Sequence, residues 1–473
     1  MRKQLLPYLL TVFMSMFGQN AFAYNFAVKN ADGMTIYYSY NDTGLTVTNS
    51  NIYNGDSYGD DYSGDVVIPE SVEYSGKIYK VTCIGNEAFF RCSSMTSISI
   101  PSSIKSISGD EVFYGCYRLT SVIISDLSSW CNVYFGNASA NPLTYYARNL
   151  FLNNKKVTKL IIPDDVTNIS SYAFSGCRDL TSVTIPNSVK EIGASAFKGC
   201  SSLTSVTIPN SVTSVGSNAF DGTPWFDNQP DGLVYVGKVA YKYKGEMPTY
   251  SRITIKDGTF EIASDAFFGC SGLTSVTIPN SVTSIERLAF GGCTGLTFIN
   301  IPNSVTSIGS SAFSECGLSS IIIPPKVSSI DNYTFWDCTE LKSVTLPNNV
   351  TSIGKYAFEG CINLKDFYSW TENVPASHSY AFSGIPFEFA TLHVPAVSVD
   401  AYKKTFPWSQ FWKIVALADD DPSPTSVNSL KVENNISPKA TFSLDGCRLS
   451  NPQRGLNIIR MSDGTTKKVI KRL

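Results

Sequence analysis

The ten residues LTSVTIPNSV occupy positions 180–189, and the same ten letters recur at 203–212 and 273–282. They belong to a longer unit, C-x-x-L-x-x-V-x-I-P-x-x-V-x-x-I-G-x-x-A-F-x-G, whose clearest copy runs from Cys177 to Gly199. A fixed period in the 20s predicts a solenoid, in which each repeat forms one coil that its neighbours cover. The phenylalanine of the unit, mostly spaced by 22 to 24 residues, falls at Phe89, Phe113, Phe174, Phe197, Phe220, Phe267, Phe290, Phe313, Phe335, Phe358 and Phe382.

The spacing within one unit predicts how a coil is built. Val183 and Ile185 alternate with hydroxyl residues, which indicates a strand with one buried face, and Pro186 ends it because proline cannot donate to a ladder. Gly193 permits a turn, and Phe197 packs the opposite wall. We therefore expect one continuous parallel β-sheet on the concave face, with short turns or 3-10 and helical segments opposite.

Composition limits the classes of function. Charged residues make up 16% of the 473 residues and the formal net charge is −2, so no strong field attracts nucleic acid or anionic lipid. Hydrophobic residues make up 43%, which is enough for a large core. The sequence therefore predicts a folded chain with no nucleic-acid partner.

The first residues are typical of a targeting signal. A basic tip, an apolar run over Leu5–Phe17 and the small residues around Ala23 predict a signal peptide over 1–23. No later stretch reaches the roughly 18 apolar residues of a membrane span. We expect a protein that is secreted or displayed on the outer cell surface, without a transmembrane segment.

Two places break the period, with insertions expected near 126–156 and 221–250. The second contains LVYVGKVAYKYKG, which predicts a β-hairpin around Gly237. Its aromatic residues either pack the hairpin onto the solenoid or contact a ligand. The hairpin candidates are Trp225, Tyr235, Tyr241 and Tyr243.

The repeated unit resembles the BspA-like class of bacterial leucine-rich repeats, which place Ile-Pro after the strand and Ala-Phe-x-Gly-Cys on the far wall. The resemblance covers residues 65 to about 417. It implies a leucine-rich repeat solenoid with coils of about 23 residues. Members of this class include adhesins that attach to host matrix proteins and to other cells, which implies a protein partner.

The ends of the solenoid need covers because the last coil otherwise leaves its core open. We expect an N-terminal β cap over 24–64, the repeats over 65–396 and a C-terminal cap over 397–417. A polar linker follows at 418–430. The small β-module at 431–473 resembles a type IX secretion sorting domain, and a plain terminal β-module remains the alternative.

Nine of the twelve cysteines occupy the same place in the repeat. Stacked coils hold equivalent Cβ atoms about 4.8 Å apart, whereas a disulfide prefers about 3.8 Å, so we expect reduced, buried thiols. Cys83, Cys131 and Cys447 lie elsewhere, and their redox state stays open. The chain has no C-x-x-C pair or histidine cluster, so no metal is expected.

The sequence predicts no catalysis and no cofactor. Only His378 and His393 are present, without a nucleophile placed to complete a triad, and no phosphate-binding glycine loop occurs. His393 lies between Leu392 and Val394 and should point outward as a surface histidine.

The outward positions of the predicted strands form the candidate binding surface. Most carry small hydroxyls, which form either a shallow hydrogen-bonding surface or an ordinary soluble β-face. Phe298, Asn300, Asp366 and Tyr368 depart from this pattern and are where specific contacts are most expected. The other candidates are Ser182, Thr184, Ser205, Thr207, Ser275, Thr277, Ser343 and Thr345.

These features predict a repeat protein that adheres to another macromolecule. The family resemblance implies that the partner is a host matrix protein or a molecule on a neighbouring cell. A glycan-binding surface protein for nutrient capture is the main alternative, which the aromatic hairpin favours. A purely architectural envelope component is the third.

Overall fold

The computed structural model describes residues 24–50 and 61–424, together with the backbone of four strands between 438 and 471. The expected signal peptide over 1–23 lies outside the described residues.

Most coils contribute one strand to each of two parallel ladders. In one coil, β15 (Ser182–Thr184) pairs with the equivalent strands of both neighbouring coils, so that Ser182 lies opposite Ser205. After a turn, β16 (Glu191–Ile192) does the same in the second ladder. The partners are 23 residues apart, so the predicted solenoid with parallel strands is confirmed.

We call the first set the SVT ladder, after the Ser-Val-Thr sequence of β15, and the second the short-strand ladder. The SVT ladder contains β4 (Gly64–Val67), β7 (Met95–Ile100), β9 (Ser121–Ile124), β11 (Asn149–Leu152), β13 (Lys159–Ile161), β15, β17 (Ser205–Thr207), β21 (Ser251–Thr254), β23 (Leu273–Thr277), β26 (Ser320–Ile322), β28 (Ser343–Leu346), β30 (Asp366–Ser369), β32 (Thr391–Val394) and β33 (Lys413–Ala416). The short-strand ladder contains β8 (Ser106–Ile107), β10 (Tyr134–Phe135), β14 (Asn168–Ile169), β16, β18 (Ser214–Val215), β20 (Val239–Lys244), β22 (Glu261–Ile262), β24 (Ser284–Ile285), β25 (Ser307–Ile308), β27 (Ser329–Ile330), β29 (Ser352–Ile353) and β31 (Ala376–Ser377).

A stack of phenylalanine rings runs through the core. Phe267 and Phe290 have ring centroids 5.2 Å apart and planes within 4°, and Phe290 stacks on Phe313 at 5.4 Å. These side chains are fully buried. The stacked arrangement is favourable for aromatic pairs and adds to the burial of large apolar surfaces.

Backbone hydrogen bonds set the same spacing at this wall. The Phe197 N–H donates to the Ala219 carbonyl of the next coil at 2.8 Å, and the Phe267 N–H donates to the Ala289 carbonyl at 2.8 Å. The residue two before each repeat phenylalanine except Phe382 takes a left-handed conformation, as at Ser195 with φ 55°. The left-handed conformation costs free energy, but the hydrogen bonds between coils fix the turn and so stabilise it.

The cysteine ladder carries free thiols, as predicted, and several of them donate hydrogen bonds that the sequence did not predict. Cys200, Cys293, Cys316, Cys338 and Cys361 carry no disulfide. The Cys200 thiol donates to the Phe174 carbonyl of the preceding coil at 3.2 Å, and the Cys293 thiol donates to the Phe267 carbonyl at 3.2 Å. Cys131 is buried, Cys83 is half-buried, and neither carries a disulfide, whereas Cys447 lies outside the described residues.

Both predicted insertions supply strands to the ladders. In the first, β10 pairs with β8 and β11 pairs with β9, and a hairpin follows through β12 (Lys155–Lys156). In the second, β19 (Gly232–Val236) and β20 form the predicted hairpin, and β20 also pairs with β22. The helices of these segments are α2 (Leu127–Cys131), η1 (Ala138–Ala140), α3 (Pro142–Tyr145) and α4 (Pro224–Asp227).

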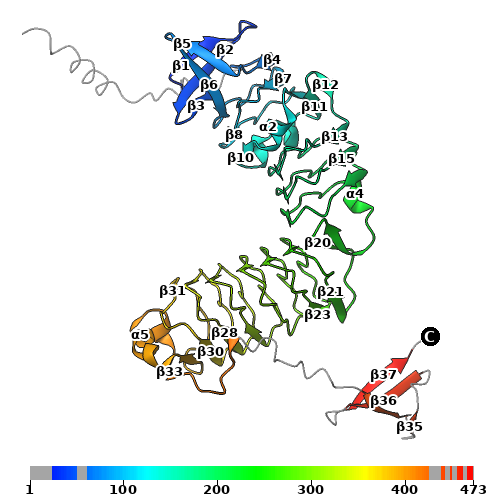
Figure 1. Cartoon of the computed structure of the whole chain (residues 1–473), viewed down its shortest axis with the longest axis vertical. Helices are drawn as coiled ribbons and strands as arrows, with labels where there is room; N and C mark the ends of the chain where they lie inside the picture. Colours follow the sequence, from blue (N-terminus) through cyan, green and yellow to red (C-terminus); the bar gives the residue numbers. More distant parts are fainter. Residues whose placement is uncertain are drawn as a thin grey trace, which may run out of the picture.

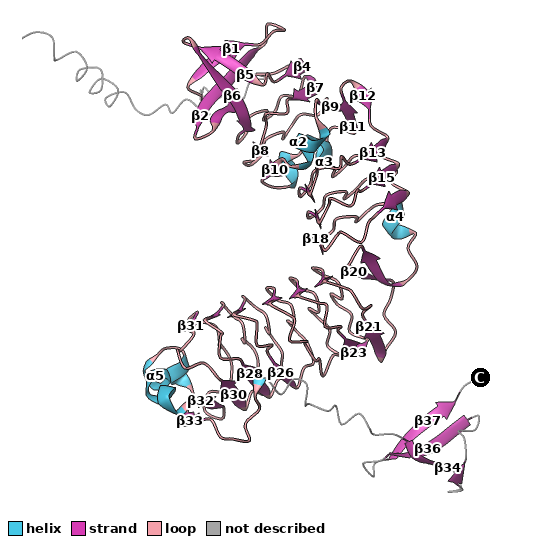
Figure 2. Cartoon of the chain, in the orientation of Figure 1, coloured by secondary structure: helices cyan, strands magenta, loops and turns pink. Residues whose placement is uncertain are grey.

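The chain bends at the second hairpin, and the SVT ladder lies on the outer side of this bend (Figures 1 and 2). The sequence placed this sheet on the concave face and expected it to be continuous. Instead, β17 and β21 end separate sheets. On the other side β18 and β20 also belong to separate sheets, but Lys238 N–H donates to the Val212 carbonyl at 2.8 Å and links the two coils there. The hairpin therefore separates the neighbouring coils on the side of the SVT ladder, and the solenoid curves toward the side of the short-strand ladder.

Both ends of the solenoid are covered. At the start, β1 (Phe26–Lys29), β2 (Thr35–Asn41), β3 (Gly44–Thr48) and β6 (Lys77–Ile84) lead into β8, and β5 (Ser71–Tyr74) pairs with β6. At the other end, Trp408 is fully buried with its ring 4.9 Å from Phe382. The segments of this cap are η2 (Ala396–Ser398), α5 (Val399–Lys404) and η3 (Trp408–Gln410).

The C-terminal strands form their own antiparallel sheet, in the order β35-β34-β36-β37. These strands are β34 (Pro438–Phe442), β35 (Arg448–Leu449), β36 (Gly455–Met461) and β37 (Thr466–Lys471).

The phenylalanine stack gives a test with a neighbouring control. Replacing buried Phe267 by alanine removes a ring that contacts both adjacent coils, and we expect a loss of about 3–5 kcal/mol in the free energy of unfolding. Phe268 is 59% exposed, and its replacement by alanine should change the free energy by less than about 0.5 kcal/mol. Guanidinium unfolding followed by circular dichroism measures both, and equal effects would contradict the assignment of Phe267 to the core.

The cysteine ladder predicts a pattern of chemical reactivity. Burial raises the pKa of Cys200 and Cys338 to about 12 each, so almost no thiolate is present at pH 8. Half-buried Cys270, whose pKa burial raises to about 11, should be alkylated before them by iodoacetamide in the folded protein. Mass spectrometry of labelled peptides measures the order, and rapid labelling of Cys200 without denaturant would contradict it.

Candidate functional site

The candidate residues before the bend form two aligned rows on the SVT ladder. Ser182 lies between Lys159 and Ser205 in one row, and Thr184 lies between Ile161 and Thr207 in the other. The threonines, Ser205 and both flanking residues are exposed, and Ser182 is half-buried. The sheet therefore presents an open, mostly neutral strip of hydroxyls.

After the bend the pattern is less regular. Ser275 and Thr277 on β23 lie opposite Arg252 and Thr254 of β21. Phe298 and Asn300 lie in the next coil, at a position where no strand is formed. Phe298 is half-buried and Asn300 is exposed, so both reach the surface.

The last coils bring Ser343, Asp366 and Tyr368 together on β28 and β30. The prediction that Thr345 belongs to the binding surface is wrong. Alternation along the strand indicated an outward side chain, but Thr345 is only 1% exposed and is not available to a partner. The Tyr368 ring stacks on His393 with centroids 4.3 Å apart. Burial, followed by the charges of Asp366 and Asp421, raises the pKa of Tyr368 to about 12, so it stays protonated.

His393 points outward from its strand, as predicted, but two carboxylates hold it. Its Nε2 lies 3.2 Å from Asp366 Oδ1, and its Nδ1 lies 3.5 Å from Asp421 Oδ2. The indole N–H of Trp370 donates to the Pro422 carbonyl at 3.0 Å. Residues 418–424, the beginning of the predicted linker, therefore fold back against the last strands.

The hairpin candidates mainly complete the core. Tyr241 is buried, and its hydroxyl accepts a hydrogen bond from Phe220 N–H at 3.1 Å. It is therefore not available to a ligand. The Trp225 ring lies 4.7 Å from Phe220, and Tyr243 N–H donates to the Ala266 carbonyl at 2.7 Å. A β-bulge between Val234 and Tyr235 shifts the register of the hairpin at this point.

Tyr235 has local partners as well. Its hydroxyl accepts a hydrogen bond from Lys256 N–H at 3.0 Å, and the Lys256 ammonium lies 4.2 Å from its ring centroid. This tyrosine therefore links the hairpin to the start of the following coil.

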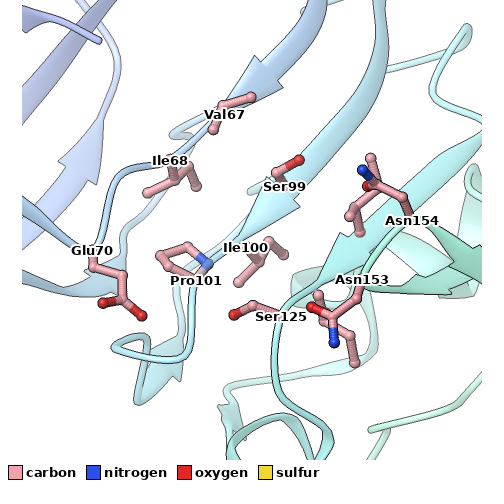
Figure 3. Close-up of a pocket in the computed structure, with 11 residues that line it drawn as sticks. Val67, Ile68, Glu70, Ser99, Ile100, Pro101, Ser125, Asn153 and Asn154 are labelled. Atoms are coloured by element: carbon pink, nitrogen blue, oxygen red, sulfur yellow. The ribbon is translucent and has the colours of Figure 1, made fainter. Parts of the chain in front are cut away.

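A groove of about 430 Å³ lies at the ends of the first SVT strands. Figure 3 shows Glu70 on one side and the turn formed by Asn153 and Asn154 on the other, with Pro101 between them. The Glu70 carboxylate accepts a hydrogen bond from the Ser102 hydroxyl at 2.7 Å. The groove offers hydrogen-bonding groups, and Glu70 is the only carboxylate among the residues that line it.

One buried carboxyl lies at the bend. Glu261 on β22 is 6% exposed, and its Oε1 accepts a hydrogen bond from Val215 N–H of β18 at 3.0 Å. Burial raises its pKa from 4.5 to about 7, and the charges of Glu286 and Glu191 act in the same direction. Sequence reasoning did not identify Glu261, because the repeat period gives no signal of this burial.

Within residues 24–50 and 61–424, no group of three or more His, Cys, Asp or Glu side chains is arranged to hold a metal ion. In the same described part of the chain, no helix has the length and apolar character needed to cross a bilayer.

The stacked coils with two parallel ladders define a leucine-rich repeat solenoid. Six copies of the BspA-type leucine-rich repeat region match residues 70–142, 144–228 and 260–387, which together span more than half of the sequence. The chain belongs to the BspA-type leucine-rich repeat family.

Several solved structures are similar to this chain. A leucine-rich cell surface protein from Faecalibacterium prausnitzii A2-165 is 24% identical, with 84% of this chain and 96% of that chain covered and a TM-score of 0.32. A leucine-rich repeat protein from Bacteroides ovatus ATCC 8483 is 24% identical, with coverage of 73% and 94% and a TM-score of 0.26. One from Eubacterium ventriosum ATCC 27560 is 19% identical, with coverage of 74% and 92% and a TM-score of 0.36. No curated protein sequence matches the chain.

Glu261 predicts a dependence of stability on pH. Because its pKa is about 7 in the folded state and 4.5 is its ordinary value, the folded protein holds this proton more tightly. The contribution of this proton to the free energy of unfolding is complete below pH 4.5. It declines as pH rises to 7, by about 3 kcal/mol in total. Glu261→Gln keeps the acceptor for Val215 and should reduce this decline.

Guanidinium midpoints at pH 5 and pH 7.5 measure the effect. Glu340→Gln is the control, since Glu340 is exposed and is not among the charges that act on Glu261. The same pH dependence in wild type and Glu261→Gln would rule out this role for Glu261.

Proposed function

We propose that this chain is a secreted or cell-surface protein that adheres to another macromolecule through the SVT ladder, without catalysing a reaction. The observation that carries the proposal is the alignment of exposed hydroxyls on consecutive strands before the bend, with Thr184 beside Thr207. A long row of shallow contacts suits an extended protein surface, where complementarity is spread over many residues.

The targeting segments belong to the same proposal. The sequence of residues 1–23 supports export, and the strands β34–β37 agree with a small C-terminal β-module. We infer that residues 431–473 act as a type IX sorting domain that directs the protein across the outer membrane.

The favoured partner is a protein of the host matrix or of a neighbouring cell, by analogy with adhesins of this family. A glycan captured as a nutrient is the second candidate, supported by the exposed aromatic rings of the first insertion, such as Tyr145 at 61% exposure. These candidates are separated by presenting the full-length chain to arrays of matrix proteins and of glycans.

Charge placed on the SVT ladder tests the surface. Thr184→Arg combined with Thr207→Arg puts two long cations in the middle of the strip, and we expect at least a roughly tenfold loss of affinity for the protein partner found on the array. Both threonines are exposed, so the fold should be kept, which circular dichroism checks.

Thr306→Arg is the control, because Thr306 is an exposed threonine beside the short-strand ladder. Surface plasmon resonance should give unchanged affinity for this variant. Loss on Thr306→Arg with full binding by the double variant would move the contact surface to the other ladder, and binding only to glycans would favour the second candidate.

A further inference from the structure

A second groove lies on the far wall of the solenoid, between the first insertion and the coils that follow it. It has a volume of about 510 Å³ and is lined by Thr144 and Tyr145 of α3, by Tyr172 and Arg178 of one coil and by Lys198 of the next. The helix can approach this closely because residue 176 is glycine: a Cβ there would collide with the Leu143 carbonyl. The insertion therefore builds one side of the groove.

Aromatic rings mark one side of this groove and continue beyond it. Tyr145 is 61% exposed, and its ring lies 6.4 Å from that of Tyr146. Tyr146 in turn lies 5.9 Å from Tyr117, which is 71% exposed. Exposed aromatic rings gathered in this way are typical of binding surfaces rather than of ordinary solvated faces.

The charge of the groove is positive. Arg178 and Lys198 are exposed, and the residues that line the groove include no Asp or Glu. The nearby carboxylate of Asp179 is already paired with Lys156 at 2.6 Å. The groove therefore complements an anionic ligand.

A polar atom inside the groove has no partner. Thr144 Oγ1 is buried and makes no hydrogen bond to the described residues. A buried hydroxyl without a partner is costly, so this side of the groove carries an unmet hydrogen bond.

The backbone groups of this wall are already paired, so they are not free to bind a peptide strand. Tyr172 N–H donates to the Ala194 carbonyl at 2.9 Å, Gly176 N–H donates to the Lys198 carbonyl at 2.8 Å, and Ser195 N–H donates to the Ser217 carbonyl at 2.9 Å. An extended peptide gains affinity mainly by pairing with free main-chain groups at a sheet edge, and these groups already bond from coil to coil.

We propose that this groove binds an anionic saccharide. A sugar ring lies against Tyr145, and its carboxylate or sulfate group lies between Arg178 and Lys198. Longer chains of the same saccharide extend along Tyr146 and Tyr117. This site is separate from the SVT ladder, and either surface can function without the other.

The test uses calorimetric titration of the full-length chain with four probes. Oligogalacturonate carries carboxylates, a heparin-derived oligosaccharide carries sulfates, maltodextrin is neutral, and poly-glutamate is an acidic peptide. We expect binding of one or both acidic saccharides, no binding of maltodextrin, and weaker binding at 500 mM than at 50 mM salt because the ionic contacts are screened. The first two probes distinguish a carboxylated from a sulfated ligand.

Arg178→Gln combined with Lys198→Gln should weaken saccharide binding at least roughly tenfold, and Tyr145→Ala should weaken it as well. Lys326→Gln combined with Lys342→Gln removes the same charge from exposed positions outside the groove and should bind like wild type. All these residues are exposed, and circular dichroism checks the fold.

Three results would overturn the proposal. Wild-type protein that binds neither acidic saccharide contradicts it directly. An equal loss of saccharide affinity in the Lys326→Gln and Lys342→Gln control would show that binding depends on net charge and not on the groove. Tighter binding of poly-glutamate than of both saccharides would assign the groove to an acidic peptide.

Discussion

The stacking of equivalent groups from coil to coil is the constraint on which the structure depends. Phe197 donates its N–H to Ala219 of the next coil at 2.8 Å, and its ring lies 5.4 Å from Phe220. The backbone bond needs only the same turn in every coil, but the ring contact needs an aromatic side chain at the same place, so the repeat tolerates little variation at its phenylalanine. The outward positions carry no such requirement, which is why one constant interior supports a varied surface.

Periodicity predicts most of this fold because the interior determines it. Residues with the period of 23 occupy the expected places, and the thiol of Cys200 is buried as its position implied. The second insertion was predicted as a hairpin and not as an additional coil, because tyrosine replaces the phenylalanine of the unit there: Tyr243 N–H donates to the Ala266 carbonyl as a repeat phenylalanine would. The 47 residues from Phe220 to Phe267 equal about two periods, which was the available signal for an additional coil.

The candidate site was harder to predict than the fold. Alternation along a strand tells which side chains point outward, but it says nothing about what later segments place over them. Thr345 is outward by sequence and still buried, while His393 is held between Asp366 and Asp421, a residue of the predicted linker. The concave placement of the sheet failed for a related reason, because curvature depends on where the hairpin enters and not on the repeated unit.

The two insertions therefore matter more for function than their lack of repeat pattern suggests. Each adds strands to a ladder, and each also creates a feature that regular coils lack. The second produces the bend, which divides the SVT ladder between β17 and β21. The first places α3 against Gly176 and so forms a groove with its own charge and aromatic rings. Because each coil contacts mainly its neighbours, such local changes alter the surface without disturbing distant coils. Regular repeats thus provide extent, and the irregular segments provide the distinctive chemistry.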